Sequence, residues 1–215
     1  MARSARLQFS PEEAVAHLQT ADSVLGTIIE AAGSYTVRPD PKRDVYQALL
    51  RSIVFQQLSG KAASTILERV LELWDGRFPT PEELASTEHA SLRACGLSNN
   101  KTLAIHDLGL KTADGTVPTM RAAQKLSDEE LVELLTQVRG IGPWTVEMLL
   151  IFQLGRPDVL PVGDLGVRKG FGRMIGAAEL PDGAALAAHA EVWRPFRSVA
   201  SWYMWRAVDL DELPL

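Results

Sequence analysis

At 215 residues the chain is long enough to bury a substantial hydrophobic core, in one large domain or in two smaller lobes. Hydrophobic residues make up 46% and charged residues 23%, which is typical of a soluble globular protein, and a single cysteine, Cys95, excludes an internal disulfide and a four-cysteine metal or iron–sulfur site. The net charge of −5 is not the basic balance usual in nucleic-acid-binding proteins, and no apolar run is long enough to span a bilayer. We therefore expect a cytoplasmic protein without a membrane partner.

Three segments begin with the same chemistry for a helix N-terminus. In each, a hydroxyl residue is followed three positions later by a glutamate, the pattern of a capping box. These pairs are Ser10 with Glu13, Thr80 with Glu83, and Ser127 with Glu130. The sequence predicts helices that start at these three points.

Apolar residues recur at helical spacing through most of the chain, as at Val45, Leu49 and Ile53, and strand-like alternation is almost absent. Breaks at residues 33–42, 75–80 and 115–119 carry no linker composition. We predict an all-α fold with two lobes. Residues 44–124 form the central helical lobe, and residues 1–43 plus 125–215 form the second.

The stretch from residue 138 to residue 169 is the most informative part of the chain. Gly140-Ile141-Gly142 allows a tight turn, and Pro143 suits the first position of a helix. The N–H groups at such a helix start form an anion site, for which a DNA phosphate is a natural ligand. Residues 136–175 contain five basic and three acidic residues, a local charge of +2, which favours DNA on this face.

A lone carboxylate, Asp164, follows about twenty residues later. A phosphate site followed by a lone carboxylate at this offset suggests an enzyme that holds DNA and carries out chemistry on it. The alternative is that Asp164 merely caps a helix over residues 165–174, a role its position also suits. The nearby Asp158 is better explained as a turn residue.

These residues together resemble the helix-hairpin-helix signature of the DNA glycosylase superfamily, and within it the 3-methyladenine DNA glycosylase II type. The resemblance rests on Gly-Ile-Gly at 140–142 combined with Leu-Pro-Val-Gly-Asp-Leu-Gly-Val-Arg-Lys at 160–169. It implies a single glycosylase unit over residues 1–215, with the helix-hairpin-helix at 129–155 and the active site in a cleft between two helical lobes. The extra N-terminal α/β domain of some members is not expected.

The resemblance assigns the catalytic role to Asp164 and a base pocket to Trp144, Trp205 and Met148. Indole rings suit bases made cationic by alkylation. The alternatives are that Trp144 only packs at the hairpin and that the tryptophan-rich C-terminal helix is simply core. Bifunctional relatives carry a Schiff-base lysine where this chain has Trp144, and residues 126–155 contain no lysine, so a monofunctional enzyme is implied.

Other roles follow from the same resemblance. Leu58, with Gln57, is expected to enter the base stack in place of the extruded nucleotide, although an ordinary core leucine is the alternative. The backbone carbonyls of Thr136, Val138 and Ile141 are expected to hold a monovalent cation, Na+ or K+, and no cofactor is required. The residues expected to bind DNA phosphates are Gly140, Gly142, Trp144, Thr145, Arg168 and Lys169.

The expected function is hydrolysis of the N-glycosidic bond of alkylated bases such as 3-methyladenine and 7-methylguanine during base excision repair. The expected partner is double-stranded DNA containing such bases, bound by a monomer associated with the nucleoid in the cytoplasm. Two rivals remain: the same fold acting on hypoxanthine or etheno adducts, and a non-catalytic helix-hairpin-helix module that binds DNA structure. A pure binder needs neither Asp164 nor the two tryptophans.

Overall fold

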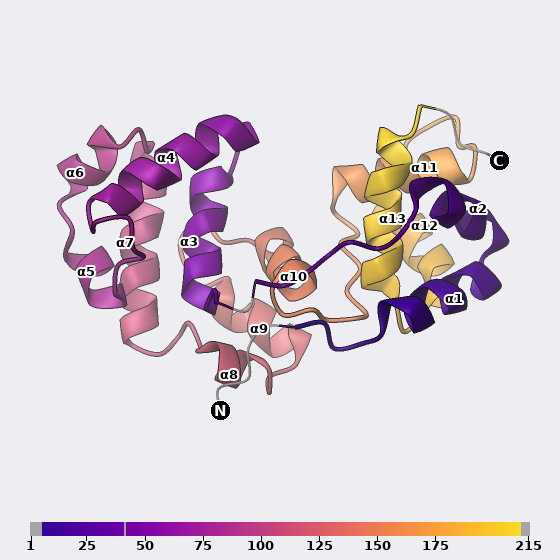
Figure 1. Ribbon diagram of the computed structural model, residues 1–215, viewed down its shortest axis with the longest axis horizontal. Helices are drawn as coiled ribbons and strands as arrows, with labels where there is room; N and C mark the ends of the chain where they lie inside the picture. The colour runs from indigo at the N-terminus through magenta and orange to yellow at the C-terminus, as the bar shows by residue number, and fades with distance from the viewer. Residues whose placement is uncertain (1–5, 41, 212–215) are drawn as a thin grey trace. The chain divides into compact units, whose positions relative to one another are not determined.

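The computed structural model describes residues 6–40 and 42–211, and every regular element in these ranges is helical, which confirms the all-α prediction (Figure 1). The chain divides into two compact units. The first contains Asp40–Leu149, and the second contains Arg6–Pro39 together with Leu150–Leu215. No helix in the described ranges is both long enough and apolar enough to cross a bilayer.

Among the described residues the first unit contains eight helices, the last of which continues into the second unit. They are α3 (Val45–Phe55), α4 (Gly60–Glu72), α5 (Pro81–Ser86), α6 (His89–Ala94), α7 (Asn99–Ala113), α8 (Met120–Ala123), α9 (Asp128–Leu135) and α10 (Pro143–Phe152). Helix α7 contacts α3, α5 and α6. A Cβ atom at Gly109 would lie 2.7 Å from the Ala85 nitrogen, so this glycine permits the close approach of α7 to α5.

The hairpin formed by α9 and α10 belongs to the first unit up to Leu149, whereas the division predicted from sequence placed it with the C-terminal helices. Two long-range hydrogen bonds explain the difference. The Gln56 side chain donates to the Gly140 carbonyl at 2.9 Å, and the Arg139 N–H donates to the Asp107 carboxylate at 2.7 Å. These bonds attach the hairpin loop to the end of α3 and to α7.

The second unit contains the N-terminal and C-terminal helices of the chain. They are α1 (Pro11–Ala21), α2 (Ser23–Ala32), α11 (Leu165–Met174), α12 (Gly183–His189), the 3-10 helix η1 (Ala190–Trp193) and α13 (Arg197–Asp209). Their inward faces form one apolar core, whose largest fully buried members include Leu18, Leu25, Ile28, Trp193 and Tyr203. The buried apolar area is what holds these short helices together.

Helices α11 and α13 cross unusually closely within this unit. A Cβ atom at Gly170 would lie 2.0 Å from the Met204 carbonyl oxygen, so only glycine allows this approach. Gly166, one turn earlier on α11, faces the ring of Trp205 on α13. The crossing brings the N-terminal end of α11 next to Trp205.

The predicted helix starts are confirmed, with one difference in detail. Thr80 and Ser127 form complete capping boxes with Glu83 and Glu130. The Ser10 oxygen accepts the Glu13 N–H as predicted, but the Ser10 hydroxyl donates to the Glu12 carboxylate. A third capping box, Asp44 with Gln47 at the start of α3, has an aspartate in place of the hydroxyl residue and was not predicted.

Candidate active site

Asp164 is the N-cap residue of α11 and is only 9% exposed. Its Oδ1 atom accepts the Val167 N–H at 2.8 Å and the Trp205 indole N–H at 2.9 Å. The helix-capping role considered from sequence is therefore present. It is compatible with a catalytic role, because the same contacts fix the position of the carboxylate at a helix N-terminus.

The indole of Trp205 is held from three directions. Its N–H donates to Asp164, and its ring lies 5.6 Å from that of Phe152 at an interplanar angle of 30°. A Cβ atom at Gly166 would be 2.7 Å from the Trp205 Cδ1 atom, which shows how closely α11 approaches the ring. Trp202, one turn earlier, packs edge-on against Tyr35.

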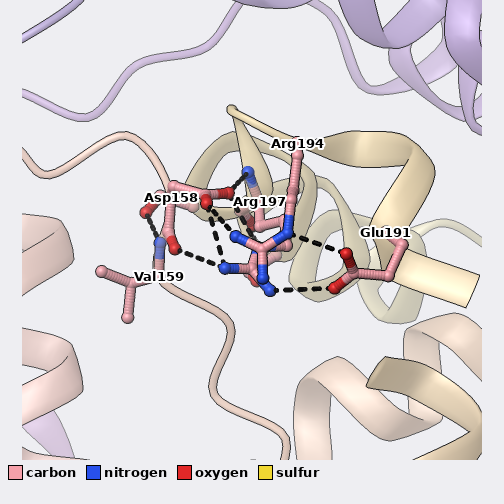
Figure 2. Close-up of polar contacts among 7 residues, drawn as sticks. Asp158, Val159, Glu191, Arg194 and Arg197 are labelled. Carbon is pink, nitrogen blue, oxygen red and sulfur yellow. Dashed lines mark hydrogen bonds and ion pairs between the residues drawn. The ribbon is translucent and has the colours of Figure 1, made fainter. Parts of the chain in front are cut away.

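The loop that leads to Asp164 is anchored to the start of α13 by ion pairs (Figure 2). The Asp158 carboxylate accepts from Arg197 Nε at 2.7 Å and from Arg194 Nη1 at 2.6 Å. Glu191 pairs with the same two arginines. Asp158 is thus engaged in positioning the loop, which is more than the turn role predicted for it and leaves Asp164 as the candidate catalytic carboxylate.

Backbone contacts strengthen this anchor. The Val159 N–H donates to Ser198 Oγ at 2.9 Å, and the Ser198 N–H donates to the Pro157 carbonyl at 3.0 Å. The Asp164 loop is therefore attached to α13 near Arg197, while Asp164 itself is attached to the same helix through Trp205. Such a rigid support is what a preorganised electrostatic site requires.

The hairpin has the predicted local geometry. Gly140 adopts a φ of +78°, and Pro143 is the first residue of α10. The Gly142 carbonyl accepts the Thr145 and Val146 N–H groups, which begins the helix. Gly142 itself does not adopt a positive φ, and a Cβ there would meet no atom within 4 Å, so its surroundings are open to a ligand such as a phosphate.

A pocket of about 360 Å³ lies in the first unit next to the hairpin. Trp144, Thr145 and Met148 form one side, and Ser52, Phe55, Gln56 and Gln57 form the other. Trp144 is 49% exposed, so it is not an ordinary packing residue at the hairpin. The structure brings Trp144, Met148 and Gln57 together, whereas Asp164 and Trp205 form their own group in the second unit.

The side chains predicted to contact DNA differ in their exposure and in the hydrogen bonds they already make within the protein. Leu58 is 40% exposed, which argues against the alternative of a core leucine. Lys169 is exposed, but the Arg168 Nε–H donates to the Pro181 carbonyl at 2.8 Å. Arg168 is therefore in part a structural residue that joins α11 to the segment before α12.

Sequence reasoning missed a buried polar cluster in the second unit. The Asp22 carboxylate caps α2 and accepts from His189 Nε2 and from the Trp193 indole N–H, both at 2.8 Å. Burial on its own raises the pKa of Asp22, but the hydrogen bonds from His189 and Trp193 outweigh it and lower that pKa below its ordinary value. These partners are more than 160 positions apart in the chain, so no local pattern could reveal them.

Cys95 and the possible metal-ligating side chains contribute no further site. Cys95 is buried, and burial raises the pKa of its thiol. Over the described ranges no group of three or more histidine, cysteine, aspartate or glutamate side chains is arranged to hold a metal ion.

Comparison with known proteins defines the class of this fold and site. Residues 50–195 match the family model described as "HhH-GPD superfamily base excision DNA repair protein". DNA-3-methyladenine glycosylase 1 of Schizosaccharomyces pombe is 39% identical over 200 residues, which cover 91% of this chain and 87% of that protein. The chain belongs to the HhH-GPD superfamily of base excision DNA repair proteins.

Solved structures place it more narrowly within that superfamily. The S. pombe 3-methyladenine DNA glycosylase in complex with abasic DNA superposes with a TM-score of 0.82 at 38% identity, covering 93% of this chain and 98% of that chain. A DNA-3-methyladenine glycosidase from Bacillus halodurans gives a TM-score of 0.80 at 35% identity, covering 96% and 92%. The chain therefore has the helix-hairpin-helix glycosylase fold of the 3-methyladenine type.

Proposed function

We propose that this protein is a monofunctional DNA glycosylase that hydrolyses the N-glycosidic bond of alkylated purines, chiefly 3-methyladenine and 7-methylguanine. The observation that carries the proposal is the buried Asp164 carboxylate, held by Val167 and Trp205 at the start of α11. The names of the relatives, which are 3-methyladenine glycosylases, support the substrate class. The partner would be double-stranded DNA, bound by a monomeric cytoplasmic protein that associates with the nucleoid.

In the proposed reaction the bond between C1′ and the base nitrogen breaks, and its electron pair leaves with the base. A methylated cationic purine departs as a neutral molecule, so no strong general acid is needed. Positive charge develops on the sugar, where the Asp164 carboxylate stabilises it. Water then adds its oxygen to C1′ and releases a proton, which leaves an abasic site with the strand intact.

Trp144 supports a monofunctional reaction. A glycosylase that also cuts the strand needs an amine to form a Schiff base with the sugar. This chain places an exposed indole at the corresponding hairpin position and no lysine within residues 126–155. Borohydride should therefore trap no covalent protein–DNA adduct, and efficient trapping would mean that another amine acts as the nucleophile.

Substrate binding would use the aromatic and backbone groups described above. Trp144, Met148 and Trp205 would contact the flipped base, and an indole attracts a cationic base by about 1–2 kcal/mol more than a neutral one. The phosphate contacts would come from the N–H groups of Gly140 and Gly142, with Lys169 as an exposed cation, whereas the Thr145 N–H already donates to the Gly142 carbonyl.

The hairpin carbonyls of Thr136, Val138 and Ile141 remain candidates for a Na+ or K+ ion. The Val138 carbonyl already accepts the Ile141 N–H at 3.0 Å, and its second lone pair can still serve an ion. Carbonyl oxygens suit a hard monovalent cation, which would supply positive charge next to a DNA phosphate.

The test is a glycosylase assay on methylated DNA, with chromatographic identification of the released bases, for the wild type and for Asp164→Asn. Asparagine can still accept the Val167 and Trp205 hydrogen bonds, so this variant removes the charge and keeps the cap. We expect a loss of roughly 100-fold or more in the single-turnover rate with damaged-DNA binding retained. Asp182→Asn, which changes the N-cap aspartate of α12, is the matched carboxylate control, and near wild-type excision by Asp164→Asn would refute the mechanism.

The same assay separates the alternatives. Release of hypoxanthine or etheno adducts in place of methylated purines would indicate the same fold with another lesion. Binding of duplex DNA without release of any base would indicate a non-catalytic helix-hairpin-helix protein.

A further inference from the structure

The turn between α3 and α4 contains a residue in an unfavourable backbone conformation. Gln57 has a φ of +57°, which a residue with a side chain adopts at a cost of about 1–2 kcal/mol. The Gln57 side chain is exposed, so burial of that side chain does not account for the conformation. Contacts made by its neighbours must therefore hold the turn in place.

Lys101 makes the first of these contacts. Its Nζ atom donates to the Val54 carbonyl at 2.7 Å and to the Gln56 carbonyl at 2.6 Å. Both acceptors lie at the C-terminal end of α3, where carbonyl groups have no partner within the helix and a cation is favourable. Lys101 thus fixes the backbone directly before Gln57.

The position of Lys101 is otherwise unfavourable. It lies in the first turn of α7, three residues after the N-cap Ser98, where the helix dipole repels a cation. It is also partly buried, and burial lowers the pKa of its ammonium group. The hydrogen bonds to the Val54 and Gln56 carbonyls compensate for the unfavourable helix dipole and for the burial of the charge. We therefore assign Lys101 the role of stabilising this turn.

Gln56 provides the second contact, on the hairpin side. Its Nε2 atom donates to the Gly140 carbonyl at 2.9 Å. The preceding residue of the hairpin loop, Arg139, donates its backbone N–H to the carboxylate of Asp107 on α7. The turn, α7 and the hairpin loop therefore form one connected group within the first unit.

We propose that Lys101 and Gln56 are positioning residues that hold Gln57 ready to fill the space left by an extruded nucleotide. This inference rests on the proposed glycosylase function. A side chain that is ordered before binding loses less conformational entropy when it enters the stack. Gln57 has the positive φ that these contacts support, and its side chain lines the pocket that contains Trp144, so the contacts act on Gln57 more directly than on Leu58.

The chemistry of glutamine suits this task. Its amide group both donates and accepts hydrogen bonds, so it can pair with the edge of the base left without a partner on the opposite strand. Leucine can only occupy space. Holding Gln57 in place would then lower the free energy needed to unstack and unpair the damaged nucleotide, which amounts to a few kcal/mol.

The experiment compares one lesion in two contexts: a fully paired duplex, and a single strand in which the nucleotide needs no extrusion. Lys101→Met keeps the aliphatic stem and removes the ammonium group, and Lys101→Arg is the conservative replacement. We expect Lys101→Met to lower excision from the duplex roughly tenfold and to change excision from the single strand less than about twofold, with arginine recovering most of the loss. Lys111→Met, at the other end of α7, is the matched control and should excise both like the wild type.

A second variant keeps the inference testable if Lys101→Met does not fold. Glycine adopts a φ of +57° without strain, so Gln57→Gly should fold normally and lose excision selectively from the duplex, by more than Leu58→Ala does. A 2-aminopurine placed beside the lesion should show weaker unstacking with the same variant.

Three results would overturn the inference. The first is an equal loss of excision on both substrates for Lys101→Met together with a lowered Tm, which would mark Lys101 as merely structural. The second is wild-type excision from the duplex by Gln57→Gly. The third is a larger loss of duplex excision for Leu58→Ala than for Gln57→Gly. If the wild type released no base from either substrate, the proposed function would fail first, and the inference with it.

Discussion

Replacing Trp205 by phenylalanine separates two roles that the structure gives to this side chain. Phenylalanine keeps an aromatic ring that can stack on a flipped base, but it removes the indole N–H that donates to Asp164 at 2.9 Å. Replacement by alanine removes both the ring and the N–H. The ratio of phenylalanine variant to wild type therefore reports on the hydrogen bond, and the ratio of alanine to phenylalanine variant reports on the ring.

The expected size follows from the surroundings of Asp164. A hydrogen bond to a charged group contributes about 1.5–3 kcal/mol, and at 9% exposure water replaces the lost donor poorly. If the bond orients the carboxylate toward the developing charge, its loss raises the barrier by a similar amount. Since each 1.4 kcal/mol corresponds to a factor of about ten, we expect Trp205→Phe to slow the chemical step roughly 10- to 100-fold.

The assay is single-turnover excision of a cationic lesion, 7-methylguanine, and of a neutral one, hypoxanthine, by each variant. Each rate is compared with the wild type on the same substrate, because the bonds differ in intrinsic lability. Trp205→Phe should lower both rates by a similar factor, since the orientation of Asp164 serves both. Trp205→Ala should lower the cationic lesion further, since only that base gains from the indole charge distribution.

Two outcomes would refute this reasoning. Wild-type rates for Trp205→Phe would show that the hydrogen bond to Asp164 does not matter for the reaction. Equal losses for both lesions in Trp205→Ala would leave the ring without a role in recognising charge. Trp202→Phe, one turn earlier on α13, is the control for a general effect of changing an indole in this helix.

Three further predictions concern glycines and a buried carboxylate. Gly142→Leu should weaken binding of damaged and undamaged duplex alike and flatten the salt dependence of binding, with no loss of Tm because a Cβ at Gly142 meets no atom within 4 Å. Gly140→Ala, at a φ of +78°, should instead lower the free energy of unfolding by about 1 kcal/mol. A Gly142→Leu variant that loses only lesion discrimination would contradict the assignment of a phosphate site to Gly142. Gly166→Ala should displace the Trp205 ring and slow excision about tenfold or more. Gly163→Ala is the control, because a Cβ at Gly163 meets no atom within 4 Å and should leave the rate unchanged. Equal single-turnover rates for the two variants would contradict the prediction. Asp22→Asn should lower the unfolding free energy by about 1–3 kcal/mol at pH 7. Because the folded-state pKa of Asp22 is lowered, the stabilisation by its carboxylate is complete above about pH 4 and is lost as pH falls through the folded-state pKa. Denaturant titrations should therefore show that the difference in unfolding free energy between wild type and Asp22→Asn shrinks at low pH. A difference that stays constant with pH would contradict the prediction.

Local features of this protein follow directly from its sequence. The helix starts at Thr80 and Ser127, the left-handed turn at Gly140 and the start of α10 at Pro143 all depend on residues a few positions apart. Capping, backbone sterics and helical periodicity act over that range, so the pattern of residue types is enough to predict them. The same applies to Asp164, whose position as the N-cap of α11 was readable from its neighbours.

Contacts between distant segments were decided only by tertiary packing. Trp205 lies 41 positions from the carboxylate to which it donates, and Trp193 lies 171 positions from Asp22. Lys101 reaches the end of α3 across more than 40 residues, and Gln56 reaches the hairpin across 84. A lysine or a tryptophan in a sequence carries no mark of its partner, because the partner is chosen by how closely helices can approach. At Gly170 and Gly166 that approach depends on the absence of a side chain on α11 and on the atoms of α13 that fill the space, so the pairing exists only once both helices are packed.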